Sequence, residues 1–503
     1  MSTINKANVI NGNTIQAQDI LNVIDALDGT TANSIVIRAD LSQGSATNLT
    51  NGNTSHAEGF SVTASGNYSH AEGWSTLASG DYSHAEGYLT TASANNSHAE
   101  GYLTNTGGGT YSHAEGRETV SYGVYSHAEG RDNVASGSYS HAEGFGTIAS
   151  GSYSHAEGKD TIAKGESSHT EGSNTEAKGN YSHAEGFNTD TVGLASHSEG
   201  LETLASGSYS HAEGWSTIAS GSNSHAEGNS TTSIGQGSHA EGYGTRTLGV
   251  YSHVEGRDTI AYGGYSHAEG RETLSSGSYS HAEGYKVNAK GQYSHAEGYN
   301  TTSSGDYSHA EGYFTLAFGS YSHAEGSETL ASGSYSHAEG TNTNASGSYS
   351  HAEGSNTDAV GESSHAEGNS TYALGGGSHA EGRLTITLGD NSHAEGYDTI
   401  AKGDYSHAEG YNTITSGSYQ HASGKFNTHG DITSLFIVGN GTSDAARKDA
   451  FKVTHSSSIV LNQTQSAAPT WTGIDGEIIP ATVEGVYRLY MWMNGSWRLS
   501  TFT

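Results

Sequence analysis

A five-residue signature, Ser-His-Ala-Glu-Gly, recurs along most of this chain at near-constant spacing. It first occurs at Ser55 and returns every 14 residues to Ser97; after one 15-residue step it resumes at Ser112 and continues every 14 residues to Ser406. A degenerate copy at Gln420 brings the total to 27 copies in 503 residues. A short period in constant register predicts a solenoid, in which each repeat is one coil stacked on the previous one.

The composition excludes several functional classes. The chain has no cysteine, which removes disulfides, thiolate metal sites and cysteine nucleophiles. Its net charge of −33 argues against nucleic acid as a partner. No apolar run approaches the roughly 20 residues that span a bilayer, and the N-terminus lacks the pattern of a secretory signal. We therefore expect synthesis in the cytoplasm and no membrane insertion.

The 14-residue unit predicts two short strands joined by tight turns, because glycine recurs twice per unit among β-branched and aromatic residues. Alternate residues of a strand share a face. In one unit the residues expected to point inward are Ser140, Ala142, Gly144, Thr147, Ala149 and Gly151. Those expected to point outward are Tyr139, His141, Glu143, Ile148 and Ser150.

Substitutions along the array support this parity. The third signature position departs from Ala only to Thr170, Ser198 and Val254. The outward position in the second strand of the unit, where Ile148 stands in the example above, accepts residues as different as Arg246 and Tyr372. One column is sterically limited and the other is free, which indicates a packed interior and an open surface.

An interior of Ala, Ser and Thr buries little apolar surface in each coil. At about 25 cal/mol per Å² of buried apolar surface, this burial contributes little free energy compared with the conformational entropy that is lost when every residue is ordered. We therefore expect several chains to associate along the outward Tyr-His-Glu face. The interface residues named from this argument are His56, Glu58, His70, Glu72, His84, Glu86, His141, Glu143, His211, Glu213, Tyr139 and Tyr153.

The glutamate column needs compensating groups. Glutamate fills the fourth signature position in 26 copies, and carboxylates about 4.8 Å apart repel by about 3.5 kcal/mol at an effective dielectric near 20. The histidine two residues earlier is the nearest donor. This predicts His–Glu hydrogen bonds between chains and a histidine pKa raised by the neighbouring carboxylates.

Histidine and glutamate are also zinc or nickel ligands by type, so the same ladder residues are candidates for a metal. We favour an interface without an ion, and we expect no cofactor. A His-x-Glu pair is shared with zinc deaminases, but those enzymes use cysteine ligands. A group copied 27 times without a nucleophile or phosphate-binding motif predicts architecture, not an enzyme.

The two ends are not repetitive. Residues 1–54 are expected to form an attachment or trimerisation segment, or a plain cap of the solenoid. Asn13 can cap a helix from Gln16 to about Leu27, and Ile35-Val36-Ile37 predicts a strand.

Residues 425–503 predict a compact β-rich domain. Strands are expected at 435–438, 451–453 and 459–461, and a hairpin at 486–499 turns at Asn494-Gly495. Aromatic side chains beside arginine suit a cell-surface glycan or protein receptor, with core packing or clamping of the trimer as the alternative. The receptor-binding candidates are Tyr487, Arg488, Tyr490, Trp492, Trp497 and Arg498.

The Ser-x-Ala-x-Gly pattern, as in Ser69-His70-Ala71-Glu72-Gly73, resembles the head repeats of trimeric autotransporter adhesins of the YadA type. The resemblance covers residues 55–424. It implies a left-handed parallel β-roll with three chains side by side. That family usually has apolar residues where this chain has His56 and Glu58, so a polar interface is expected here.

A second resemblance is to bacteriophage tail fibres and fibres of contractile injection particles. It rests on the N-terminal segment Asn8 to Thr14 and on the C-terminal segments 436–441 and 449–453. The order along the chain, with a short N-terminal piece, then the repeats and then a small β domain, is also similar. The membrane anchor and secretion signal of the adhesin family are not recognisable.

Together these features predict an all-β homotrimeric fibre on a virion tail or extracellular particle. It would be held by a baseplate or tail protein at its N-terminus and mediate attachment to a host cell. The alternatives are a bacterial surface adhesin and an ion-binding or ice-binding solenoid. Against ice binding, strand alternation places the regularly spaced threonines, such as Thr147 and Thr161, in the interior of the roll.

Overall fold

The structure, a computed structural model, describes residues 35–38, 48–456, 458–461, 468–469, 478–483 and 486–500. The chain divides into two compact units, Met1–Arg257 and Asp258–Thr503. The regular elements of the described residues are β-strands and one 3₁₀ turn at Asp444–Ala446. The helix predicted from Gln16 to Leu27 lies outside the described residues. No helix of the described part has the length and apolar character needed to cross a membrane.

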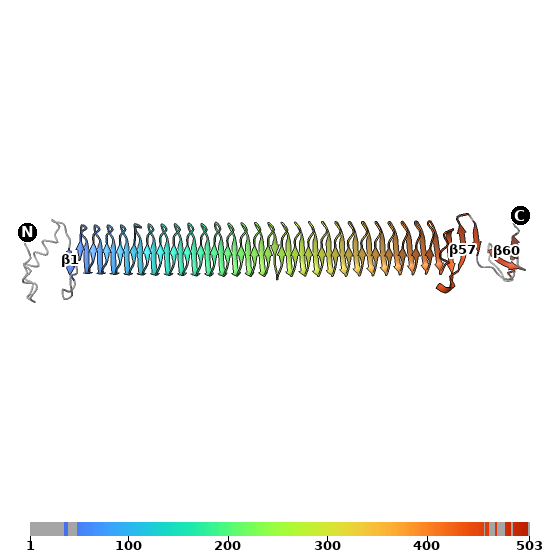
Figure 1. Cartoon of the computed structure of the whole chain (residues 1–503), viewed down its shortest axis with the longest axis horizontal. Helices are drawn as coiled ribbons and strands as arrows, with labels where there is room; N and C mark the ends of the chain where they lie inside the picture. Colours follow the sequence, from blue (N-terminus) through green and yellow to red (C-terminus); the bar gives the residue numbers. More distant parts are fainter. Residues whose placement is uncertain are drawn as a thin grey trace, which may run out of the picture. The chain divides into compact units, whose positions relative to one another are not determined.

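Each coil of the repeat consists of a five-residue strand, a corner, a two-residue strand and a second corner. In one coil these strands are β15 (His141–Phe145) and β16 (Ile148–Ala149). The next coil supplies β17 (His155–Lys159) and β18 (Ile162–Ala163). Like strands of successive coils pair in parallel and in register, as Figure 1 shows for the stacked arrows. The predicted parallel β-solenoid is confirmed.

Both units contain this stack, and every long strand begins at a signature histidine. In the first unit the long strands run from β3 (His56–Phe60) to β29 (His239–Tyr243) and β31 (His253–Val254), and the short strands from β2 (Leu49–Thr50) to β30 (Arg246–Thr247). In the second unit they run from β33 (His267–Arg271) to β55 (His421–Lys425) and from β32 (Ile260–Ala261) to β54 (Ile414–Thr415). The strand predicted at 35–37 is present as β1 (Ile35–Arg38), which pairs in parallel with β3.

The interior is built from the small residues that strand alternation predicted to point inward. Ala142, Ala149 and Thr147 have no exposed surface and Ser140 has 2%, whereas His141 is half-buried on the outer face. The threonine column is therefore enclosed, and it presents no face to ice. Small side chains let the two sheets of a coil approach closely, which is why larger residues are rare in these columns.

The expectation that Gly144 points inward is wrong. Gly144 is exposed and has a φ of +110°, a region that side-chain-bearing residues rarely adopt. A Cβ at this position would lie 2.1 Å from the carbonyl oxygen of Gly158 in the next coil. This glycine is needed for the positive φ inside β15 and for close stacking of coils, not for a thin interior.

One coil has a larger residue in the buried alanine column. Val254 replaces alanine in the buried column, and it has no exposed surface. Its strand, β31, is two residues long instead of five. Thr170, a residue of similar branched shape in the same column, lies in a full five-residue strand, β19 (His169–Ser173), so the size of the buried residue does not by itself explain the short strand.

The last coil is capped by two side-chain amides. Asn427 stands in the threonine column; its Oδ1 accepts a hydrogen bond from the Ile414 amide at 2.7 Å, and its Nδ2 donates to the Ile414 carbonyl at 2.8 Å. Gln420 replaces the signature serine and donates to the carbonyl of Ser434 at 2.8 Å. These amides satisfy backbone groups that a further coil would otherwise pair.

Beyond the repeats the long-strand sheet continues and a second sheet follows. β56 (Ser434–Asn440) pairs in parallel with β55, and β57 (Asp449–Thr454) and β58 (Ile459–Leu461) follow antiparallel. A separate antiparallel sheet contains β59 (Ile478–Val483), β60 (Val486–Met493) and β61 (Ser496–Ser500). The predicted hairpin is confirmed, with Asn494 and Gly495 at φ values of 50° and 80°.

Candidate functional site

The signature histidines form a continuous stack within each unit. The rings of His84 and His98 lie 4.7 Å apart at 9°, and those of His141 and His155 lie 4.8 Å apart at 5°. Parallel in-register pairing of the long strands sets this spacing. The side chains are partly exposed, at 34% for His84 and 37% for Glu86, so this face of the chain is only half covered.

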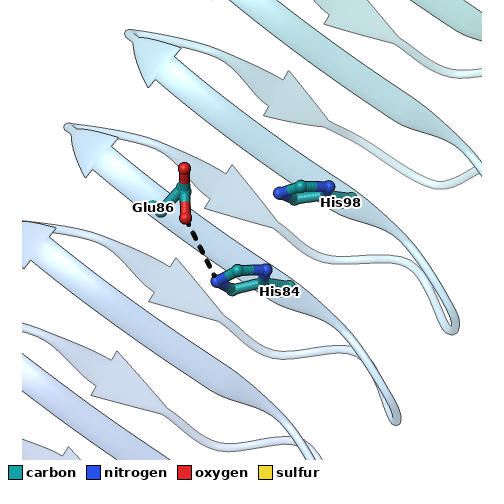
Figure 2. Close-up of side chains that lie close together, drawn as sticks. All are labelled: His84, Glu86 and His98. Atoms are coloured by element: carbon teal, nitrogen blue, oxygen red, sulfur yellow. Dashed lines mark ion pairs between the residues drawn. The ribbon is translucent and has the colours of Figure 1, made fainter.

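Each glutamate lies beside the histidine of its own coil, because residues two apart in a strand share a face. Figure 2 shows His84 and Glu86 directed toward one another, with His98 of the next coil on the same side. The Nε2–Oε2 distances of the predicted pairs are 3.5 Å for His56–Glu58, 3.6 Å for His70–Glu72, 3.5 Å for His84–Glu86, 3.6 Å for His141–Glu143 and 3.9 Å for His211–Glu213.

These distances correct the predicted His–Glu hydrogen bond. An N–H···O bond spans about 2.7–3.2 Å, and the five pairs are all longer. His421 and Glu409, from neighbouring coils, do reach 3.2 Å. In the five pairs given above, imidazole and carboxylate lie close without a direct hydrogen bond within one chain.

Some carboxylates bridge successive coils. Glu129 places Oε2 3.9 Å from His127 and Oε1 3.8 Å from His141. Glu381 does the same, at 3.9 Å from His379 and 3.7 Å from His393. We call the combined column of signature histidines and glutamates the His–Glu ladder.

The prediction of raised histidine pKa values is wrong for ladder histidines such as His84, His113 and His309, whose pKa values are lowered. Burial lowers the pKa of His84, and the neighbouring His98 lowers it further, against the opposing effect of Glu86. Burial, followed by repulsion from the adjacent imidazoles, lowers the pKa of His113 and of His309 to about 4. Stacking removes water from each ring and brings like charges together, and the carboxylates are too distant to compensate.

Several ladder glutamates retain protons instead. Burial, then hydrogen bonds with Glu143 and Glu115, raise the pKa of Glu129 to about 7. A hydrogen bond with Glu395, then burial, raise the pKa of Glu381 to about 7. Stacked carboxyl groups therefore relieve their repulsion by sharing protons along the column. A shallow groove follows these carboxylates in the second unit, lined by Glu367, Glu381, Glu395, Glu409 and signature glycines.

The tyrosines named with the ladder form a column of their own at a corner of the coil. The rings of Tyr139 and Tyr153 stack at 4.9 Å, and they are 50% and 59% exposed. Their φ values are 58° and 60°, a left-handed conformation that costs energy for a bulky residue. Sequence reasoning missed this corner, although Asn96 and Gly237 in the same column are the residues that favour it.

The C-terminal candidates do not form one exposed patch. Trp492 and Trp497 are cross-strand partners with rings 5.2 Å apart. Tyr490 is 9% exposed, so the expectation of an exposed Tyr490 is wrong. Arg488 shares a face with Trp492, whereas Arg498 points to the opposite face by strand alternation. Tyr487 lies on β60, but its side chain is outside the described part of the structure.

Comparison with known families finds one similarity. A model described as the YadA head domain repeat (2 copies) matches residues 142–165, 212–238 and 296–322. All three stretches lie within the repeat array, and each includes ladder residues. No curated protein matches the chain. The repeats are thus similar to YadA head repeats, as the signature indicated.

Proposed function

We propose that the chain assembles as a homotrimeric fibre in which the His–Glu ladder lies at the seam between chains. The ladder carries this proposal, since it repeats coil after coil on a face that one chain leaves only half covered. The Nε2 atoms of His84 and His98 are buried without a hydrogen-bond partner, a state that polar contacts from neighbouring chains would relieve. The similarity to YadA head repeats supports the trimer.

The fibre's role is attachment of a phage-like tail particle to a host cell surface. One end would dock on a baseplate or tail protein, and the C-terminal β region would meet a glycan or protein receptor. Three tips held together bind more strongly than one, because the second and third contacts form at a high effective concentration. The role is mechanical and multivalent, without catalysis, and places the protein on a virion tail or extracellular particle after synthesis in the cytoplasm.

A bacterial surface adhesin is the second candidate, and the YadA head similarity favours it specifically. The two functions differ in where the protein is found. An antibody against the repeats should label tail-like particles in electron micrographs if the chain is a tail fibre, and the cell envelope if it is an adhesin.

Truncation tests the receptor role. A chain that ends at Leu461 keeps β56–β58, which extend the sheet of the roll, and loses β59–β61. We expect this truncated protein to remain trimeric and to lose cell binding. Truncated protein that still binds cells would contradict a C-terminal receptor tip, and a monomeric product would assign β59–β61 to trimer clamping instead.

A further inference from the structure

We propose that the His–Glu ladder binds divalent transition-metal ions of the zinc class as a linear array, with repeated sites along each stack. The sites are built from the imidazole Nε2 and the carboxylate of one coil and the imidazole of the next. Groups of this kind, with ligand atoms within 4.8 Å of one another, include His84–Glu86–His98 and His141–Glu143–His155. One chain carries all of these ligands, so the inference does not depend on the trimer.

The Nε2–Oε2 spacing between histidine and glutamate fits two ligands of one metal ion better than it fits a hydrogen bond. The Nε2–Oε2 distance is 3.4 Å in His225–Glu227 and 3.5 Å in His84–Glu86, beyond the range of an N–H···O bond. Two ligands bound to one zinc at about 2.0–2.2 Å in tetrahedral geometry are about 3.3–3.5 Å apart. Many of the pairs therefore already have the separation of two ligands on one metal ion.

The imidazole nitrogens that would bind the ion make no hydrogen bond. The Nε2 atoms of His84, His98 and His141 are buried and have no hydrogen-bond partner. A buried ring nitrogen in this state loses free energy relative to water, and a metal ion would satisfy its lone pair. The ion would bind the neutral imidazole, because a metal ligand must be deprotonated.

Recruiting the second histidine requires a small local change. The rings of His84 and His98 are nearly parallel, so their nitrogen lone pairs are also parallel and do not converge on one point. Rotation of one ring about its terminal torsion, which has a broad energy minimum, would direct both nitrogens to a shared ion. Metal binding should therefore disrupt the regular ring stack while leaving the backbone in place.

Charge and ligand type select the ion. The 26 ladder glutamates supply most of the net charge of −33, which concentrates cations along the ladder. Mixed imidazole and carboxylate ligands suit zinc, nickel and copper, whereas calcium and magnesium prefer oxygen ligands alone. Excess magnesium should therefore not displace bound zinc.

The test counts zinc ions on the full chain. The protein is stripped with a chelator, equilibrated with zinc chloride and excess magnesium, separated from free metal, and analysed for metal content. We expect several zinc ions per chain. One variant replaces four ladder carboxylates, Glu86→Gln, Glu115→Gln, Glu143→Gln and Glu171→Gln, each the centre of one His–Glu–His group. It should bind about four fewer ions than the parent, one for each site removed.

A charge-matched control separates ligation from general attraction. The changes Glu118→Gln, Asp132→Asn, Asp160→Asn and Glu202→Gln remove the same charge at corner positions outside the ladder. This control should keep the parent's zinc content, and circular dichroism should show that both variants retain the β fold. At most one zinc per chain in the parent, or equal zinc loss in both variants, would overturn the proposal.

Discussion

At the residue scale, the fold depends on how little space the interior allows. Alanine, serine and threonine fill it, and the parity of inward and outward residues could be predicted from the sequence because strand alternation is strict. Positions with a positive φ could not be predicted in this way. Gly144 inside β15 and Tyr139 at a corner have φ values of 110° and 58°, and strand alternation does not describe the direction of a residue in this conformation.

The size limit yields a direct prediction. Ala142→Val adds two methyl groups to a column of alanines with no exposed surface. We expect local opening of this coil to become easier by about 1–3 kcal/mol. Hydrogen exchange measured by mass spectrometry should then be roughly 5- to 150-fold faster around residue 142.

Phe145→Tyr is the matched control in the same strand. Its side chain is exposed at 37%, and other coils carry tyrosine at this position, as at Tyr299. Its effect should stay within about 0.5 kcal/mol. Equal protection in Ala142→Val and the parent would show that the interior is looser than the buried alanines indicate.

At the scale of the element, the His–Glu ladder shows which electrostatic effects a sequence reveals. The columns themselves could be predicted, since a fixed period in a strand places like residues one above another. The direction of the histidine pKa shift could not. It depends on ring-to-ring distances of about 4.7 Å and on desolvation, and both are properties of the folded stack.

The lowered pKa values predict that acid weakens the fold. The unfolded chain takes up protons at its histidines below a pKa of about 6.5, whereas folded His113 and His309 resist protonation down to about 4. Stability should therefore decrease as the pH falls from about 6.5 to 4. Glu129 and Glu381, with pKa values raised to about 7, act in the opposite direction, but more histidines than glutamates are shifted.

Thermal denaturation in chelator-treated buffer measures this effect. The melting temperature should fall steadily between pH 6.5 and 4. The double change His429→Asn and His455→Asn removes the two histidines outside the ladder and should leave the pH profile unchanged. A melting temperature that is constant or rises toward pH 4 would show that the ladder histidines are not shifted downward.

At the scale of the whole molecule, the repeat and its period were enough to predict a parallel β-solenoid, because identical coils stack only in register. The ends were less predictable. The break in the signature at Gln420 marks the end of the array, whereas the capping role of Asn427 and the burial of Tyr490 depend on packing that the sequence pattern does not specify.

The central claim is that the His–Glu ladder joins three chains. Sedimentation equilibrium in dilute buffer tests it most directly, because it measures mass independently of shape. We expect a species of three times the chain mass of 52.1 kDa that persists to low concentration. A single species of 52.1 kDa would contradict the claim and leave the ladder as a solvent-facing surface.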